Sequence, residues 1–294
     1  MRFALLADRQ DIAVLHTDGV LYNVSALDRD GYVSRFPYPS RLPGNLYSNN
    51  TDLLSESAAL LDEAESHRFL SKYTVPSDAV ILAPVPRPAR VLAIGRNYAE
   101  HAKEQGANVA EEPIVFLKAS QSVIAHREPI VIPPGIGRVD YEAELAVVIG
   151  RGGRNIAEAD AYPHVAGYTI LNDITARDMQ KKARSSNLPW FLSKSLDTFC
   201  PMGPYLVTPD EIPDPHNLRI MLSVNNVVMQ DDTTASMVFK IPTLIAYLSR
   251  FFALEPGDVI ATGTPSGIGA IVPGDTVSVT ITGLGTLTNP VVAG

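Results

Sequence analysis

The sequence predicts a mixed α/β fold in which strands predominate. The chain has 294 residues, of which 23 are proline and 20 are glycine, and this content indicates many turns rather than long helices. From residue 90 onward, short apolar runs of strand length alternate with turns rich in proline and glycine. A chain of this length can form one large domain or two ordinary ones with a substantial core.

The N-terminal part contains a hairpin pattern and one helical pattern. The segments IAVLHT and VLYNV flank the pair Asp18 and Gly19, which is a strong signal for a type I′ hairpin turn. Residues 51–70 predict an amphipathic helix, because leucines recur at positions 53, 54, 60 and 61 among polar residues. We expect both elements to be structural.

A proline-rich connector, LAPVPRPAR at residues 82–90, predicts the domain boundary, since three prolines within five positions resist both helix and central strand. We therefore predict a small β-rich domain with one helix over residues 1–85 and a catalytic domain over residues 86–294. The second domain begins with the strand RVLAIG and a short helix around residues 97–106. Further along, SVNNVVMQ predicts another hairpin.

The bulk composition indicates small-molecule chemistry. A net charge of −8, with a pI near 5.2 and no Lys/Arg-rich block, argues against binding to nucleic acid or to an anionic membrane surface. The first residues, MRFALLADRQ, contain an apolar stretch too short for a signal segment, and no later run approaches a membrane span, so we expect a cytoplasmic protein. The single cysteine, Cys200, excludes an internal disulfide and a cysteine zinc cluster, and we expect it to serve packing.

Two glutamates interrupt an apolar strand pattern in VDYEAELAVVIG, residues 139–150. Side chains at i and i+2 of a strand point to the same face, so Glu142 and Glu144 are neighbours. If both are buried, their repulsion and lost hydration favour a bound cation. A solvated edge strand is the alternative, but the continuous apolar run of residues 145–149 is typical of a strand covered on both faces.

Asp173, at the end of the strand pattern GYTILND, is a candidate third ligand. By itself it could equally be the N-cap of the segment that follows. Together with Glu142 and Glu144, it would complete a set of three carboxylates without histidine or thiolate. Such a set suits Mg²⁺ or Mn²⁺, with positions left for water or substrate, and suits Zn²⁺ poorly.

Six motifs in order make the sequence resemble the fumarylacetoacetate hydrolase superfamily over roughly residues 88–270. They are AIGRNYAEHAKEQG, EEPIVFLKASQSV, VDYEAELAVVIG, GYTILNDITARDMQ, LPWFLSKSLDTFCPMGP and GDVIATGTPSGIG. The resemblance implies a mixed-β roll as the C-terminal catalytic domain, a smaller N-terminal domain before it, and a homodimer. It also implies that Glu142, Glu144 and Asp173 hold Mg²⁺ or Mn²⁺.

The resemblance also implies the remaining site residues. His101 and Glu104, three apart on one helix face, would form a catalytic dyad on a mobile lid, although such a pair alone is usually a solvated surface ion pair. Lys194 would be catalytic. The expected substrate contacts are Arg96, Lys118, Arg177, Gln180 and Thr264, with Tyr98 a weaker candidate. Lys194 and Lys118 could each instead be an ordinary strand-edge cation. Arg177 could instead pair structurally with Asp178 or another carboxylate. The segment GTPSGIG lacks the Gly-Lys-Ser/Thr of a phosphate loop and is interpreted as a tight turn.

By this resemblance we expect metal-dependent cleavage of a carbon–carbon bond in a small α-keto acid. The metal would chelate the carboxylate and 2-oxo oxygens and stabilise a pyruvate enolate, whether the reaction is hydrolysis of a 3-acylpyruvate or decarboxylation of oxaloacetate. A 2-oxo-alkenoate hydratase or isomerase and a non-catalytic metabolite-binding protein are the alternatives. The sequence separates neither these reactions nor the substrates.

Overall fold

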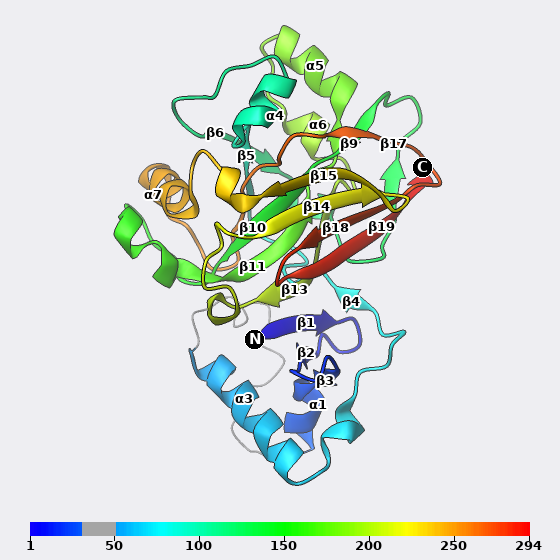
Figure 1. The fold of residues 1–294 in the computed structure, drawn as a ribbon, viewed down its shortest axis with the longest axis vertical. Coiled ribbons are helices and arrows are strands. Elements are labelled where there is room, and N and C mark those ends of the chain that lie inside the picture. Colours follow the sequence, from blue (N-terminus) through cyan, green and yellow to red (C-terminus); the bar gives the residue numbers. More distant parts are fainter. Residues whose placement is uncertain (31–50) are drawn as a thin grey trace.

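The computed structural model describes residues 1–30 and 51–294, and these form three sheets with short helices at their edges (Figure 1). The largest sheet has 11 strands and runs in the order β3-β2-β1-β13-β11-β10-β16-β5-β6, with β4 paired to β1 and β7 to β13. Its strands are β1 (Arg2–Leu6), β2 (Ile12–Leu15), β3 (Leu21–Asn23), β4 (Ile81–Leu82), β5 (Val91–Gly95), β6 (Ile114–Lys118), β7 (Val123–Ile124), β10 (Ala143–Ile149), β11 (Val165–Asn172), β13 (Cys200–Val207) and β16 (Val259–Ala261). The mixed, mainly β fold class is confirmed.

Two smaller sheets lie in the C-terminal part of the chain. One has the order β12-β9-β17, and the other has the order β15-β14-β18-β19-β8. Their strands are β8 (Ile130–Ile132), β9 (Val139–Tyr141), β12 (Thr175–Ala176), β14 (Arg219–Val224), β15 (Val227–Thr233), β17 (Gly269–Ile271), β18 (Thr276–Ile281) and β19 (Gly285–Ala293). Apolar residues from the large and five-stranded sheets share one core cluster, which includes Leu145, Val147, Ile220 and Val279. The two sheets therefore pack against each other over this cluster.

Most of the helices gather at two opposite ends of the molecule, and α7 lies at its side (Figure 1). In Figure 1, α1 and α3 lie with the N-terminal strands, while α4, α5 and α6 gather at the far end of the large sheet. Their bounds are α1 (Val24–Arg29), α3 (Thr51–Ser66), α4 (Ala99–Glu104), α5 (Arg177–Ser185), α6 (Phe191–Lys194) and α7 (Ile241–Phe251). The predicted helix over residues 51–70 thus ends at Ser66, and a separate 3₁₀ turn, Leu70–Tyr73, follows it. Leu60 and Leu61 are buried, as the leucine pattern predicts.

The two predicted hairpins form with different turns. Asn225 and Asn226 both have positive φ, at 50° and 65°, between β14 and β15, which is the type I′ conformation. In the N-terminal hairpin, only Gly19 has positive φ, and its N–H donates to the carbonyl of His16. The predicted type I′ turn at Asp18-Gly19 is therefore wrong, because Asp18 stays in the ordinary φ range and a longer loop with a left-handed glycine joins the strands.

The N-terminal strands continue the large sheet. β1 pairs with β13 in the register Arg2↔Val207 and Phe3↔Leu206. A second core cluster joins N-terminal side chains such as Phe3 and Leu27 to Val148 of β10. The division into domains at residues 85 and 86 remains a prediction, while the sheet itself extends across that point.

Candidate active site

The strand predicted over residues 139–150 is broken at Glu142, which places the two glutamates at a junction between sheets. β9 belongs to the three-stranded sheet and β10 to the large one, with Glu142 between them. Asp173 follows β11, the neighbour of β10, and its N–H donates to the Glu142 carbonyl at 2.8 Å. Carboxylate oxygens of Glu142, Glu144 and Asp173 lie within 4.8 Å of one another, and all three residues are buried.

The alternatives weighed for these residues are resolved by this arrangement. Glu142 and Glu144 are 4% and 1% exposed, so they do not belong to a solvated edge strand. Asp173 is not an N-cap either, because α5 begins at Arg177 after the extended residue Ala176. The buried carboxylate triad, defined as Glu142, Glu144 and Asp173, is thus a feature that requires positive charge.

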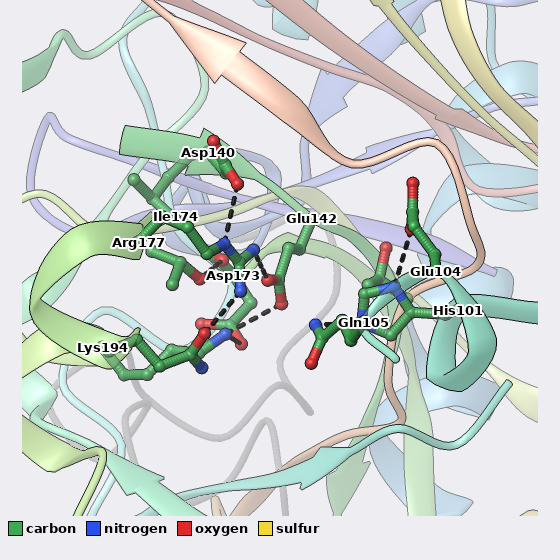
Figure 2. A network of polar contacts seen from close by, with 12 residues as sticks. His101, Glu104, Gln105, Asp140, Glu142, Asp173, Ile174, Arg177 and Lys194 are labelled. Atoms are coloured by element: carbon green, nitrogen blue, oxygen red, sulfur yellow. Dashed lines mark hydrogen bonds and ion pairs between the residues drawn. The ribbon is translucent and has the colours of Figure 1, made fainter. Parts of the chain in front are cut away.

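Two members of the carboxylate triad have cationic partners. Lys194 donates to Glu142 Oε2 at 2.8 Å and to Asp173 (Figure 2). Lys118 donates to Asp173 Oδ1 at 2.6 Å. Arg177 donates to Glu142. Burial opposes ionisation of Glu142, but the charges of Lys194 and Arg177 hold its pKa well below the ordinary value. Burial likewise opposes the charge of Lys194, whose pKa is nevertheless raised by Asp173 and Glu142.

Glu144 is compensated differently. Its only described hydrogen-bond donor is the Gly263 N–H, which lies 2.8 Å from Oε2. Burial raises the pKa of Glu144 well above its ordinary value, and the charges of Asp173 and Glu142 add to the effect. A hard divalent cation between the three carboxylates would supply the missing positive charge. The donor set therefore fits Mg²⁺ or Mn²⁺, and the identity of the ion remains a proposal.

The predicted dyad forms on α4. His101 Nδ1 lies 3.2 Å from Glu104 Oε2, and His101 Nε2 lies 2.9 Å from the amide nitrogen of Gln105 (Figure 2). His101 is 3% exposed, which differs from a solvated surface pair. Burial lowers the pKa of His101, although Glu142 and Glu104 oppose this shift. The lowered pKa favours the neutral imidazole. Because the Gln105 amide donates to Nε2, the ring proton of this form is on Nδ1 and is directed at Glu104.

The loop formed by residues 263–267, from the GTPSGIG motif, joins the dyad to the carboxylate triad. Gly263 N–H donates to Glu144, as described above, and Gly267 N–H donates to Glu104 Oε1 at 3.1 Å. Both glycines have a φ of +94°, and a Cβ on Gly267 would lie 2.4 Å from the Met229 carbonyl oxygen. The tight turn predicted here therefore also supplies two backbone donors to the site.

One small pocket collects most of the predicted residues. It is lined by Ile94, Gly95, Arg96, His101, Gln105, Phe116, Glu142, Glu144, Asp173, Gln180, Trp190, Lys194 and Thr264. Glu104 contacts His101 but does not line the pocket. The mobility predicted for the lid remains a prediction, and in this structure the segment is anchored by the buried residues Tyr98 and Ala102.

Lys118 and Arg177 lie outside the pocket lining. Lys118 directs its ammonium to Asp173 and to the carbonyls of Ile174 and Lys194. Arg177 donates to Asp140 Oδ2 at 2.7 Å, to Gln180 and to Glu142. In this structure both cations stabilise the carboxylates from outside the pocket, and their direct contact with substrate remains a prediction.

Gln230 is a site residue that the sequence analysis missed. It is 1% exposed on β15, and its Oε1 accepts the Ala143 N–H at 3.0 Å, between the two glutamates. Its Nε2 donates to Thr264 Oγ1 at 2.9 Å and to the Pro265 carbonyl at 2.8 Å. The only sequence signal is a polar residue inside the second strand of a hairpin, and such a residue is usually solvated.

Sequence comparisons show which known proteins this chain is similar to. Residues 90–292 match the family described as Fumarylacetoacetate (FAA) hydrolase C-terminal. The chain is 44% identical over 250 residues to human "Oxaloacetate tautomerase FAHD2A, mitochondrial", and the match covers 82% of this chain and 79% of that protein.

No helix in the described residues is long and apolar enough to cross a membrane.

Two solved structures resemble the whole chain. A 5-carboxymethyl-2-hydroxymuconate delta-isomerase from Mycobacterium smegmatis has a TM-score of 0.75 and 34% identity, covering 100% of this chain and 99% of that one. A maleylpyruvate hydrolase from Sphingobium sp. SYK-6 has a TM-score of 0.77 and 31% identity, covering 100% of both chains. These similar proteins are named as an isomerase and a hydrolase, and the human relative as a tautomerase.

Proposed function

This chain belongs to the fumarylacetoacetate hydrolase family, and from that membership we propose that it is an enzyme that interconverts the keto and enol forms of a small α-keto acid. The reaction moves a proton at the carbon beside the 2-oxo group. The observation that carries the proposal is the pocket that joins the carboxylate triad to a buried neutral histidine. Related proteins named as a tautomerase and an isomerase support the same class of chemistry.

The chain's own residues can perform the proton transfer. His101 Nε2 accepts a proton from the carbon beside the 2-oxo group, while Glu104 holds the ring through Nδ1. In this structure the Gln105 amide is hydrogen-bonded to His101 Nε2, so this hydrogen bond must break before Nε2 can accept the proton. The electron pair moves to the 2-oxo oxygen, which takes up a proton to give the enol, and the reverse steps regenerate the ketone.

Charge on the 2-oxo oxygen is stabilised by groups around it. Lys194 stays protonated beside Glu142 and Asp173 and supplies positive charge. Thr264 Oγ1 accepts a hydrogen bond from Gln230, so its own proton can be donated to a substrate oxygen. Glu142, Glu144 and Asp173 would hold a divalent ion, which when bound supplies Lewis-acid polarisation of the α-keto acid.

Cleavage of a carbon–carbon bond is the second candidate. The similarity to a maleylpyruvate hydrolase along the whole chain favours it. In hydrolysis of a 3-acylpyruvate, His101 would activate water for attack on the distal carbonyl, and a carboxylic acid and pyruvate would be released. In decarboxylation of oxaloacetate, CO₂ would leave without attack by water.

Two signals, measured with oxaloacetate and with acetylpyruvate in the presence of Mg²⁺ or Mn²⁺, distinguish the two candidate reactions. Decay of enol absorbance of oxaloacetate and of acetylpyruvate reports tautomerisation, and coupled detection of pyruvate reports cleavage. We expect enol decay that far outpaces pyruvate release. Pyruvate formation at the rate of enol decay would favour cleavage instead, and the absence of both signals would contradict either function.

The His101→Ala variant tests the base. Turnover should fall by about 10² to 10⁴-fold, the usual contribution of general acid–base catalysis, with metal affinity retained. His216→Ala, which alters a partly buried histidine outside the pocket lining, is the control and should keep turnover. Wild-type turnover in His101→Ala would place the base elsewhere.

A further inference from the structure

Phe116 and Trp190 separate the pocket from a second cavity. Both residues line the pocket, and both also line an apolar groove that is formed by residues 114–117 and 188–191. The pocket has a free volume of about 10 Å³, room for about one water molecule, whereas the groove has about 540 Å³. The apolar wall, defined as the side chains of Phe116 and Trp190, thus divides a small space beside the carboxylate triad from a large apolar one.

The apolar wall begins at the carboxylate triad. Lys194, which is paired with Glu142 and Asp173, has its ammonium nitrogen 5.1 Å from the centroid of the Phe116 ring. The Trp190 ring follows, with its centroid 5.7 Å from that of Phe116 and its plane inclined by 62°. This series of contacts leads from the triad to the groove. A substrate bound at the triad therefore lies next to the apolar wall.

Trp190 is held in place by its neighbours. A Cβ on Gly95 would lie 2.9 Å from Trp190 Cζ3, so the indole ring packs directly against the end of β5. The guanidinium carbon of Arg96 lies 5.7 Å from the ring centroid, and among the described residues Arg96 Nε has no hydrogen-bond partner. The ring therefore offers this cation a favourable contact that displacement of Trp190 would break. Gly95, Arg96 and Phe116 together hold the indole against the pocket.

Gln105 is the lining residue that an entering substrate displaces. Its amide lies 2.9 Å from His101 Nε2, and it must leave this nitrogen before the base can act. The space gained in this way lies beside His101, where the proton is transferred. It does not extend the pocket into the groove, because Phe116 and Trp190 still lie between the two cavities. The head group of an α-keto acid can enter, whereas a long tail directed at the apolar wall cannot.

We propose that Trp190 sets the upper size of the substrate. With Phe116 it closes the pocket toward the apolar groove, so 2-oxo acids with a short tail are accepted and those with a long alkyl tail are excluded. The inference rests on the proposed function and names its substrate class. Without the indole ring, the pocket and the groove would join, and an alkyl tail would bury apolar surface in the groove instead of meeting the wall.

Oxamate derivatives test the size limit without turnover. Oxamate has the shape of pyruvate but carries nitrogen in place of the carbon that loses a proton, so it cannot form an enol. N-methyloxamate and N-hexyloxamate differ only in the length of the tail. Calorimetric titrations in the presence of Mn²⁺ should show that wild type binds the methyl compound about tenfold or more tightly than the hexyl compound. Equal affinities of wild type for the two compounds would overturn the proposal.

Variants locate the limit. Trp190→Ala should bind N-hexyloxamate at least as tightly as N-methyloxamate, because the tail can then enter the groove. The ratio of the two affinities within each protein cancels any change in affinity for the shared head group. Trp190→Leu keeps a smaller apolar side chain and should show a partial fall of the ratio. It provides the test by itself where the alanine variant does not fold.

Phe191→Ala is the matched control, because Phe191 is the next aromatic residue and lines the groove but not the pocket. This variant should keep the wild-type ratio of affinities. A wild-type ratio in both Trp190 variants, or an equal fall of the ratio in Phe191→Ala, would overturn the assignment of the limit to Trp190.

Kinetics separate this inference from the proposed function. Acetylpyruvate and heptanoylpyruvate are the short-tailed and long-tailed substrates, and decay of their enol absorbance reports turnover. We expect wild type to have the higher kcat/KM with acetylpyruvate and Trp190→Ala to lose this preference. If wild type acts on both with equal kcat/KM, the size limit is wrong and the function stands. If the oxamates are discriminated as expected but no 2-oxo acid is converted, the size limit stands and the function is wrong.

Discussion

Glu144 is the residue on which the metal assignment most directly depends, because among the described residues no cationic side chain pairs with this carboxylate of the triad. Replacing a residue that only supports a metal ligand typically lowers metal affinity by about 10–100-fold. Glu144→Gln alters a proposed ligand itself, so the affinity for Mn²⁺ should fall by at least that factor, and activity should fall with it. Calorimetric titration measures the affinity. Glu158→Gln, at an exposed position, is the control.

The same variant should not destabilise the metal-free protein. A buried carboxylate with a raised pKa opposes folding when it is ionised, and the neutral amide removes that penalty. In the presence of a chelator, the Tm of Glu144→Gln should equal or exceed that of wild type. A large loss of Tm under these conditions, or unchanged Mn²⁺ affinity, would contradict the role assigned to this carboxylate.

Gln230 on β15 is hydrogen-bonded to β10 and to the loop at residues 263–267. Its replacement therefore tests how much these contacts contribute to stability and to the site. Gln230→Met keeps the length of the side chain but leaves the Ala143 N–H without its acceptor and Thr264 and the Pro265 carbonyl without their donor. We expect a loss of about 3 kcal/mol in the free energy of unfolding, together with weaker metal binding and a higher KM. Chemical denaturation and metal titration measure the first two effects.

Gln230→Glu is the informative companion variant. It keeps an acceptor for the Ala143 N–H and removes the amide donors to the loop, so metal affinity should suffer less than in Gln230→Met. Equal loss of metal affinity in the two variants would show that the Ala143 contact does not position the glutamates.

The N-terminal hairpin and α1 are joined by a buried acidic group that predicts a pH effect. Asp11 accepts hydrogen bonds from Arg29 and, at 2.8 Å, from Asn23. Burial raises the pKa of Asp11, but these partners more than offset it, so the folded-state pKa lies below 3.8. A carboxyl with a lowered pKa stabilises the fold above its unfolded pKa and loses that contribution as the pH falls through the folded value.

Asp11→Asn should therefore be destabilised at neutral pH by about 2 kcal/mol, with a difference from wild type that shrinks below about pH 3.8. Thermal melts of both proteins from pH 3 to pH 7 measure this. Asp62→Asn, at an exposed position on α3, is the control. A difference that stays constant over the whole range would contradict the ionic origin of the effect.

At the scale of the whole molecule, the described surface contains an exposed apolar strand. β15 lies at the edge of the five-stranded sheet, and Val227, Val228 and Met229 along it are 62%, 51% and 45% exposed. Edge strands with exposed apolar side chains are commonly covered by another chain. The homodimer expected from the sequence remains a prediction, and this edge is a candidate for its interface.

Light scattering at micromolar concentration should give the mass of a dimer, or of a larger assembly, for wild type. Val228→Asp should shift the mass toward the monomer, because a charge in an apolar interface is costly. Val80→Asp, at another exposed valine, is the control. A monomeric wild type would contradict the prediction, and an unchanged mass for Val228→Asp would place the interface elsewhere.

Local patterns in the sequence determined the mainly β fold, the family and the composition of the carboxylate triad. The i and i+2 spacing of an extended chain predicts that Glu142 and Glu144 share one site, as they do, and the turn signal at Asn225 and Asn226 predicts the hairpin that forms. The glutamate pair and the hairpin turn each depend on residues close together in the chain. They follow from backbone geometry, which the sequence encodes locally.

The tertiary structure decided which partners the charged groups have. Lys118 contacts Asp173 across 55 positions, Gln230 contacts Ala143 across 87, and Gly267 contacts Glu104 across 163. No periodicity encodes such pairs, because they arise when separate elements pack around a common core. The unpaired Arg96 is known in the same way, since only the packed chain shows that no carboxylate among the described residues reaches it.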